Sequence, residues 1–184
     1  MRTLFMTLFT LLVACGPKQA PSAATTGASV TLAMSQVQMK SGEVIAVPEA
    51  LSRQINKALT KAGVQTTALP VSEYPDTLNK RTMPTHRASA LVEVANQPSL
   101  LVLVEAKALF YSQLRGQNRW VVSVEATAVA ADSSENAIAR RFDVPVFLRY
   151  NHEREAEALS TAGPTIARRV ERLVRDALSL AEAP

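Results

Sequence analysis

Three long stretches in the C-terminal half of the chain are predicted as β-strands, and the second and third alternate apolar with polar residues, which is the pattern of strands that bury one face. They cover residues 100–114, 119–131 and 138–150. Turn-forming residues separate them at 115–118 and 132–136, so we expect an antiparallel three-strand meander. Pro145 has no N–H to donate to a neighbouring strand and therefore favours an edge position for the third strand.

The alternation also assigns side chains to faces. In the second predicted strand, one face carries Trp120, Val122, Val124, Ala126 and Ala128, and the other carries Arg119, Ser123, Glu125 and Thr127. In the third predicted strand, the apolar face carries Phe142, Val144, Val146, Leu148 and Tyr150. We therefore expect the meander to bury one face and to expose the other.

Two other stretches repeat apolar residues at helical spacing. The first begins at Pro48, ends at Gly63 and shares one face among Leu51, Ile55, Ala58, Leu59 and Ala62. The second begins at Pro164 and shares one face among Ile166, Val170, Leu173, Val174, Ala177 and Ala181. A shorter helical segment is expected at 153–160, with a break at Gly163 and Pro164, because proline removes a helical N–H.

The N-terminal part of the domain predicts short strands. Residues 30–39 read as a first strand with a bulge near Ser35, where the alternation slips by one position. Residues 64–69 read as a short second strand. Residues 70–84 hold three prolines and predict a surface loop in which Tyr74 packs rather than binds.

Residues 85–96 are compatible with two structures. A helix would begin with Thr85 as its N-cap and end before Pro98. A strand is the alternative, because Val92 and Val94 flank Glu93 in alternation.

Together the elements predict one α+β domain over residues 30–184, with a mixed sheet dominated by the C-terminal three-strand antiparallel meander and with helices packed on one face. The chain has 184 residues, of which 47% are hydrophobic and 20% are charged. This length and composition suit a single folded domain.

A targeting segment precedes this domain. Arg2 is followed by an apolar run at 4–13, which is typical of a signal peptide and shorter than the roughly 20 residues that span a bilayer. The residues Leu12-Val13-Ala14-Cys15 resemble the lipobox at which bacterial lipoprotein signal peptidase cuts. The resemblance implies that residues 1–14 are removed and that Cys15 is acylated, which anchors the protein to a membrane.

Residues 15–29 comprise this cysteine and a segment rich in Pro, Ala, Ser, Thr and Gly, which predicts a flexible tether. In enterobacterial lipoproteins an aspartate after the cysteine retains the protein at the inner membrane. Gly16 stands there instead, and resemblance to that rule implies an outer-membrane protein. We expect its domain to face the periplasm, and the sequence leaves exposure on the cell surface open as the alternative. Cys15 is the only cysteine, so the fold has no intramolecular disulfide.

Charge and motifs argue against several functions. Loss of Arg2 with the leader leaves 19 basic and 16 acidic side chains, and only 5% of residues are aromatic, so we expect no nucleic-acid binding. The sequence has no nucleophile elbow and no phosphate loop, and its only imidazoles are His86 and His152. We therefore expect no enzyme activity, no cofactor and no metal.

One candidate partner surface remains on the outside of the last predicted helix. Its four arginines are Arg168, Arg169, Arg172 and Arg175. Guanidinium groups can bind the phosphate of a lipid or the acidic patch of a partner, although the solvated face of an amphipathic helix carries such charges as well.

The predicted order of elements, over about residues 30–180, resembles two groups of envelope lipoproteins. One is the TolB amino-terminal and CsgG-like group, and the other is the lipopolysaccharide-assembly lipoprotein. We expect a non-enzymatic adaptor or assembly factor that docks on a larger cell-envelope complex, because a tethered domain with an exposed sheet edge suits strand addition or surface docking. The alternative is a carrier that encloses a lipid or another small apolar ligand. The sequence leaves the partner and the oligomeric state open.

Overall fold

A computed structural model describes residues 29–75, 78, 82–96, 98–130, 133–149 and 155–181. The predicted leader, Cys15 and residues 16–28 of the predicted tether lie outside this range. The strands are β1 (Ser29–Val37), β2 (Val44–Ala46), β3 (Gln65–Leu69), β4 (Leu100–Leu114), β5 (Gln117–Ala130) and β6 (Ser133–Arg149). The helices are α1 (Glu49–Lys61), α2 (Pro84–Val94), α3 (Glu155–Ala181) and the short 3-10 helix η1 (Val71–Glu73).

The strands form one mixed sheet in the order β2-β1-β4-β5-β6. The predicted meander is confirmed, since β4, β5 and β6 pair antiparallel in sequence order and β6 is at the edge. β1 runs parallel to β4 and also parallel to β3, which pairs with its first half. β2 pairs antiparallel with the second half of β1. This strand was not predicted, because three residues are too few to show a period. The predicted α+β class is confirmed.

β1 differs from its prediction. It ends at Val37 and has no bulge near Ser35, since its register with β4 is unbroken from Val30 to Gln36. The sequence suggested a slip because apolar residues follow one another there. The structure accommodates them by burying both faces of β1, with Leu32 on one side and Ala33 on the other.

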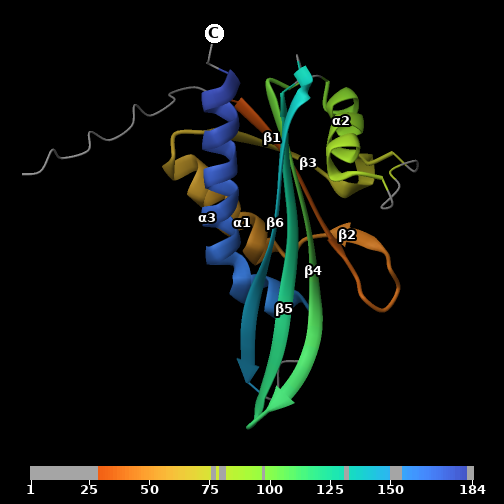
Figure 1. Cartoon of the computed structure of the whole chain (residues 1–184), viewed down its shortest axis with the longest axis vertical. Coiled ribbons are helices and arrows are strands. Elements are labelled where there is room, and N and C mark those ends of the chain that lie inside the picture. The colour runs from red at the N-terminus through yellow and green to blue at the C-terminus, as the bar shows by residue number, and fades with distance from the viewer. Residues whose placement is uncertain are drawn as a thin grey trace, which may run out of the picture.

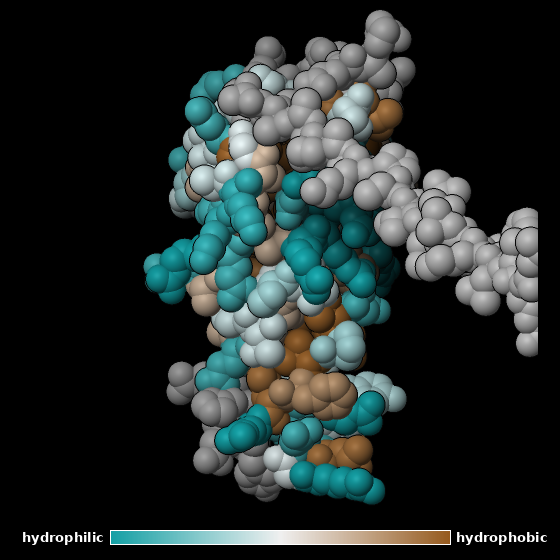
Figure 2. Space-filling view, turned by 90° about the vertical axis from the view of Figure 1, so that its left-hand side faces the viewer, coloured by the Kyte–Doolittle hydropathy of each residue, from teal (hydrophilic) through white to brown (hydrophobic). Residues whose placement is uncertain are grey.

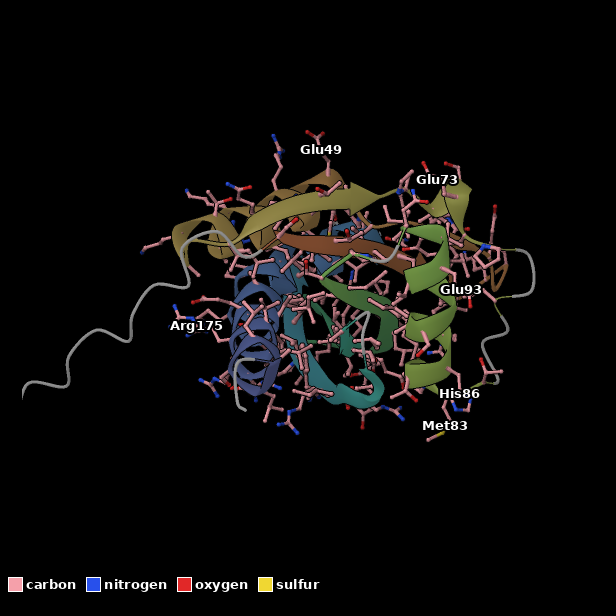
Figure 3. All side chains as sticks on the ribbon, turned by 90° about the horizontal axis from the view of Figure 1, so that it is seen from above. Glu49, Glu73, Met83, His86, Glu93 and Arg175 are labelled. Carbon is pink, nitrogen blue, oxygen red and sulfur yellow. The ribbon has the colours of Figure 1, made fainter. Side chains whose placement is uncertain are left out.

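The helices cover both faces of the sheet, which corrects the expectation that they share one. Helices α1 and α3 pack on one face over the larger core, while α2 packs on the opposite face against Ala33, Leu101 and Leu103 (Figures 1 and 3). We call these the α3 face and the α2 face. The run of five buried apolar residues at the start of β4 requires this arrangement, because both faces of that segment need cover.

For residues 85–96 the structure has the helix, α2. Its N-cap is Met83 and not Thr85, and Pro84 occupies a first-turn position, where the fixed φ of proline fits a helix and its missing N–H costs nothing. The helix ends at Val94, before Pro98, and Asn96 follows with a φ of 55°. Tyr74 packs against the core on this face, as predicted.

The predicted break at Gly163 and Pro164 is wrong, because α3 continues through both residues. The two halves bury side chains in the same core, Leu159 before the proline and Ile166 after it, and this shared burial offsets the lost hydrogen bond. Figure 1 shows the first part of α3 at an angle to the rest, as an internal proline causes.

The connection between β4 and β5 is tighter than predicted. It consists of Arg115 and Gly116, whose φ values of 48° and 75° are both positive, as in a type I′ hairpin turn. β6 begins at Ser133, five residues earlier than expected, so the second connection is also shorter than 132–136. The three long strands extend past the helices at the end opposite to the start of β1 (Figure 1).

Candidate functional site

A buried arginine on α2 connects three elements. Arg87 is 5% exposed, and its Nε donates to the two carboxylate oxygens of Glu105 on β4 at 3.0 and 3.1 Å. Its Nη2 donates to Glu105 and, at 3.2 Å, to Glu125 on β5, while its Nη1 donates to the carbonyl of Thr82. Nη1 of Arg141 on β6 lies 3.8 Å from Oε1 of Glu125, the carboxylate oxygen that does not accept from Arg87.

The electrostatics of this group favour the charged form of Arg87. Burial acts to lower the pKa of Arg87, but hydrogen bonds and charges from Glu105 and Glu125 outweigh burial and raise that pKa. Tyr74 lies close enough for Glu105 to affect it, and burial together with this carboxylate raises the pKa of Tyr74 well above its ordinary value of 10. Within the described part of the chain, the Tyr74 hydroxyl has no hydrogen-bond partner.

A cavity of about 300 Å³ opens beside these side chains, lined in part by Lys107 and Ser123. The Ser123 hydroxyl donates a hydrogen bond to the carboxylate of Asp143 on β6 at 2.6 Å. Because Nε, Nη1 and Nη2 of Arg87 all donate to the protein, we interpret the group as a clamp that holds α2 on the sheet.

The sequence analysis did not single out this clamp, although two signals were present. Arg87 precedes Leu91 by four residues and so lies on the apolar side of α2. Glu105 interrupts the longest buried apolar run of the chain's described strands. One basic and one acidic residue at positions predicted to be buried indicate an ion pair, because a buried charge without a partner is costly.

All four predicted arginines of α3 are exposed, and two of them line a cleft. Arg175 points away from the sheet (Figure 3) and pairs with Glu171 at 2.6 Å, and Arg168 is exposed. Arg169 and Arg172 instead line a cleft of about 270 Å³ between α3 and β6. The other lining residues are Arg140, Arg141, Phe142, Leu173 and Asp176, and we call the whole group the arginine cleft.

Inside the arginine cleft the guanidinium of Arg169 lies 4.6 Å from the ring centre of Phe142, a cation–π contact. Sequence analysis missed Arg140, which shares the face of Phe142 and Val144 on β6. A charged residue at a position of the predicted buried face was the available signal.

A second exposed feature lies where the long strands extend past the helices. Four large apolar side chains there are more than half exposed, and we call them the aromatic tip: Phe110 at 55%, Tyr111 at 69%, Leu114 at 53% and Phe147 at 57%. Figure 2 shows apolar surface at the lower end of the α3 face, the face on which Phe110 pairs with Trp120. A group of exposed apolar side chains at one end of a sheet is a candidate interaction surface.

Local geometry orders the aromatic tip. The register of β4 and β5 shifts between Phe110 and Ser112, so Tyr111 is the extra residue of a bulge. The guanidinium of Arg119 lies 5.4 Å from the Tyr111 ring and 5.9 Å from the Phe147 ring. On the other face, Phe110 meets Trp120 edge to face at 5.5 Å. These contacts hold the exposed rings in place before any partner arrives.

Other predicted residues are placed as follows. His86 is exposed on α2, and His152 lies outside the described residues. Within the part of the chain that the structure describes, no three His, Cys, Asp or Glu side chains gather as metal ligands. None of the described helices is long and apolar enough to cross a membrane.

No family model matches the sequence, and a comparison with curated proteins finds no match. Among solved structures, the fold is similar to that of rare lipoprotein B from Shewanella oneidensis, with 10% identity, a TM-score of 0.42, and coverage of 84% of this chain and 99% of that chain. It is also similar to a minor lipoprotein from Acinetobacter baumannii, with 10% identity, a TM-score of 0.44, and coverage of 79% and 91%. A PelC dodecamer from Paraburkholderia phytofirmans has 8% identity, a TM-score of 0.43, and coverage of 82% and 88%.

Proposed function

We propose that this chain is a bacterial envelope lipoprotein, held to a membrane by lipid on Cys15, that acts as a non-enzymatic adaptor. In this proposal the aromatic tip docks on an apolar surface of a larger envelope complex. The anchor rests on the lipobox Leu12-Val13-Ala14-Cys15 and on the signal-peptide pattern before it. Gly16 favours the outer membrane, with the domain in the periplasm.

The observation that carries the docking proposal is the position of the aromatic tip. The tether would enter the domain at Ser29, and β1 runs parallel to β4 from this end of the sheet. The aromatic tip lies at the other end of β4, whose 15 residues span about 50 Å. A domain anchored at one end can thus present its far end to a partner away from the membrane.

The chemistry of the aromatic tip fits a protein partner. Aromatic residues and arginine are enriched at the centres of protein interfaces, where they contribute most of the binding energy. Arg115, Arg119 and Arg149 surround the tip, and residues 110–119 and 145–149 contain no carboxylate. We therefore expect the partner's surface to be apolar with an acidic rim.

The test combines crosslinking in cells with substitution at the tip. Tyr111→Ser with Phe147→Ser removes two exposed rings. Met83→Ser with Leu180→Ser is the matched control, because these apolar side chains are 64% and 57% exposed at the N-cap of α2 and near the end of α3. A partner that the parent and the control capture should be lost from the tip variant. With purified partner, we expect affinity to fall at least about tenfold.

Equal capture by both variants, or no reproducible partner at all, would contradict docking through the tip. A lipid that remains bound at one copy per chain in native mass spectrometry would favour the carrier alternative instead.

The anchor is tested separately. Metabolic labelling with a fatty-acid analogue should mark the parent and not Cys15→Ser. Gly16→Asp should move the labelled protein from the outer to the inner membrane in an enterobacterial host. Mature protein with an unmodified thiol would contradict the anchor.

A further inference from the structure

We infer that the arginine cleft between α3 and β6 binds the phosphate group of an anionic lipid headgroup. The choice of a lipid as the source of the phosphate rests on the proposed membrane anchor. The phosphate chemistry itself rests on the cleft alone.

The first argument is an excess of cations. Four arginines line the cleft, Arg140 and Arg141 of β6 and Arg169 and Arg172 of α3, against the single carboxylate of Asp176, and the guanidinium of Arg141 lies on the other face of the sheet beside Glu125. Arg141 is near Glu125, but among the described residues neither Arg140 nor Arg172 has a carboxylate within ion-pair distance. Like charges on the two walls of one cleft repel one another, and an anion bound between them would offset this repulsion.

The second argument is the arrangement of the donors. The guanidinium of Arg169 rests 4.6 Å from the Phe142 ring centre, so one face of this group is against an apolar surface. A guanidinium held in this way still has the N–H groups of its edge available, and paired N–H groups match two oxygens of a phosphate. Arg140 and Arg172 face the same space from the two walls of the cleft.

The third argument is the position of the cleft along the sheet. Arg140 pairs with Ala126, and the same row continues through Val104 to Met34 of β1. Met34 is five residues from the start of β1, or about 17 Å along the strand. Leu114, at the tip, lies ten residues from Val104, or about 33 Å. The cleft is thus nearer to the end where the proposed tether enters, and so nearer to the membrane.

The test uses the mature chain from residue 15 with Cys15→Ser, which retains every described element but cannot be acylated. We would measure binding to phosphatidylcholine vesicles containing phosphatidic acid, to vesicles with an equal charge from a carboxylate lipid, and to phosphatidylcholine alone. Arg140→Gln with Arg172→Gln removes two cations from the cleft. Arg53→Gln with Lys61→Gln is the charge-matched control, because both of these side chains are exposed on α1.

We expect the parent and the control to prefer phosphatidic acid vesicles, and the cleft variant to bind them about tenfold to thirtyfold more weakly. Inorganic phosphate should compete with these vesicles in the parent. Equal loss in the cleft variant and the control, or equal binding to the carboxylate vesicles, would overturn the phosphate site. Binding of inorganic phosphate without vesicle binding would overturn the lipid as its source.

The tip-docking experiment of the proposed function does not depend on Arg140 or Arg172. If the cleft variant loses vesicle binding but still captures the partner, the arginine cleft and the aromatic tip act independently. If no partner is captured through the aromatic tip but the parent still binds phosphatidic acid vesicles, the adaptor proposal is contradicted and the phosphate site in the cleft is retained.

Discussion

Arg87 of α2 and Glu105 of β4 are joined by hydrogen bonds from one guanidinium to both oxygens of one carboxylate, with 6% and 15% of their side chains exposed. The same arginine also donates a hydrogen bond to Glu125 of β5 and so links α2 to a second strand. The pair therefore provides a directional contact in a face of the sheet that is otherwise held by a small apolar cluster.

Removing one partner of this pair should be costly. Arg87→Met leaves Glu105 partly buried without its counter-charge, and we expect the free energy of unfolding to fall by about 3–5 kcal/mol in urea titrations. Adding Glu105→Met should restore most of the loss, because a buried apolar pair needs no counter-charge. Arg53→Met, at a 71% exposed side chain, is the control and should change stability by about 1 kcal/mol or less. A small effect of Arg87→Met would contradict the clamp.

Stability at alkaline pH should depend on Tyr74. Folding raises the pKa of its hydroxyl, so the folded state keeps a proton that the unfolded state releases above about pH 10. The resulting stabilisation is complete below pH 10 and is lost as the pH rises further. Tyr74→Phe has no proton to lose and should flatten this part of the stability curve, measured by urea titration from pH 8 to about 11. Identical curves for parent and variant would show that the buried hydroxyl does not control the decline.

Gly163 permits close packing of α3 on α1. A Cβ at this position would lie 1.9 Å from Oε1 of Gln54 on α1, so Gly163→Ala forces that side chain to move. In a Gln54→Ala background the obstacle is gone, and the same substitution should stabilise the helix by about 1 kcal/mol through its higher helix propensity. A double-mutant cycle should therefore give an unfavourable coupling between the added methyl group and the native Gln54 side chain. Additive changes in the free energy of unfolding would show that a methyl group at residue 163 does not contact the Gln54 side chain.

Substitutions in the β4–β5 turn should change the stability of the fold in opposite directions. Both of its residues have positive φ, which asparagine and glycine adopt more easily than other residues do. Arg115→Asn should therefore raise the free energy of unfolding by a few tenths of a kcal/mol, and Gly116→Ala should lower it by about 1 kcal/mol. No atom lies within 4 Å of a Cβ at residue 116, so the expected loss comes from backbone strain alone. Thermal unfolding of the two variants, which should shift in opposite directions, measures this.

The long elements were predictable because their patterns are local. β4 runs over Leu100–Leu114 as predicted, and α1 occupies the predicted stretch between Pro48 and Gly63. In α1 the period of the apolar residues reports the helical geometry directly, and β4 was recognisable from its long apolar run and the turn residues that follow it. The edge position of β6 was also readable, since Pro145 lacks the donor that an inner strand needs.

The candidate surfaces were only half predictable. Sequence analysis named Arg169 and Arg172 but grouped them with Arg168 and Arg175, because helical spacing shows which residues share a helix and not what faces them. Arg140 joins the cleft from a strand that is distant in sequence. The aromatic tip was likewise hidden, because Tyr111 and Phe147 look like core residues until the helices are seen to stop short of them.

The sequence by itself determined the α+β class, the meander and the amphipathic helices, since each follows from periodicity and turn residues within a short stretch of chain. Only the tertiary structure decided that α2 covers the second face, that α3 continues through Pro164 and that Arg87 meets Glu105. These outcomes depend on burial against residues far away in the chain, and that burial can outweigh a local preference of a few kcal/mol.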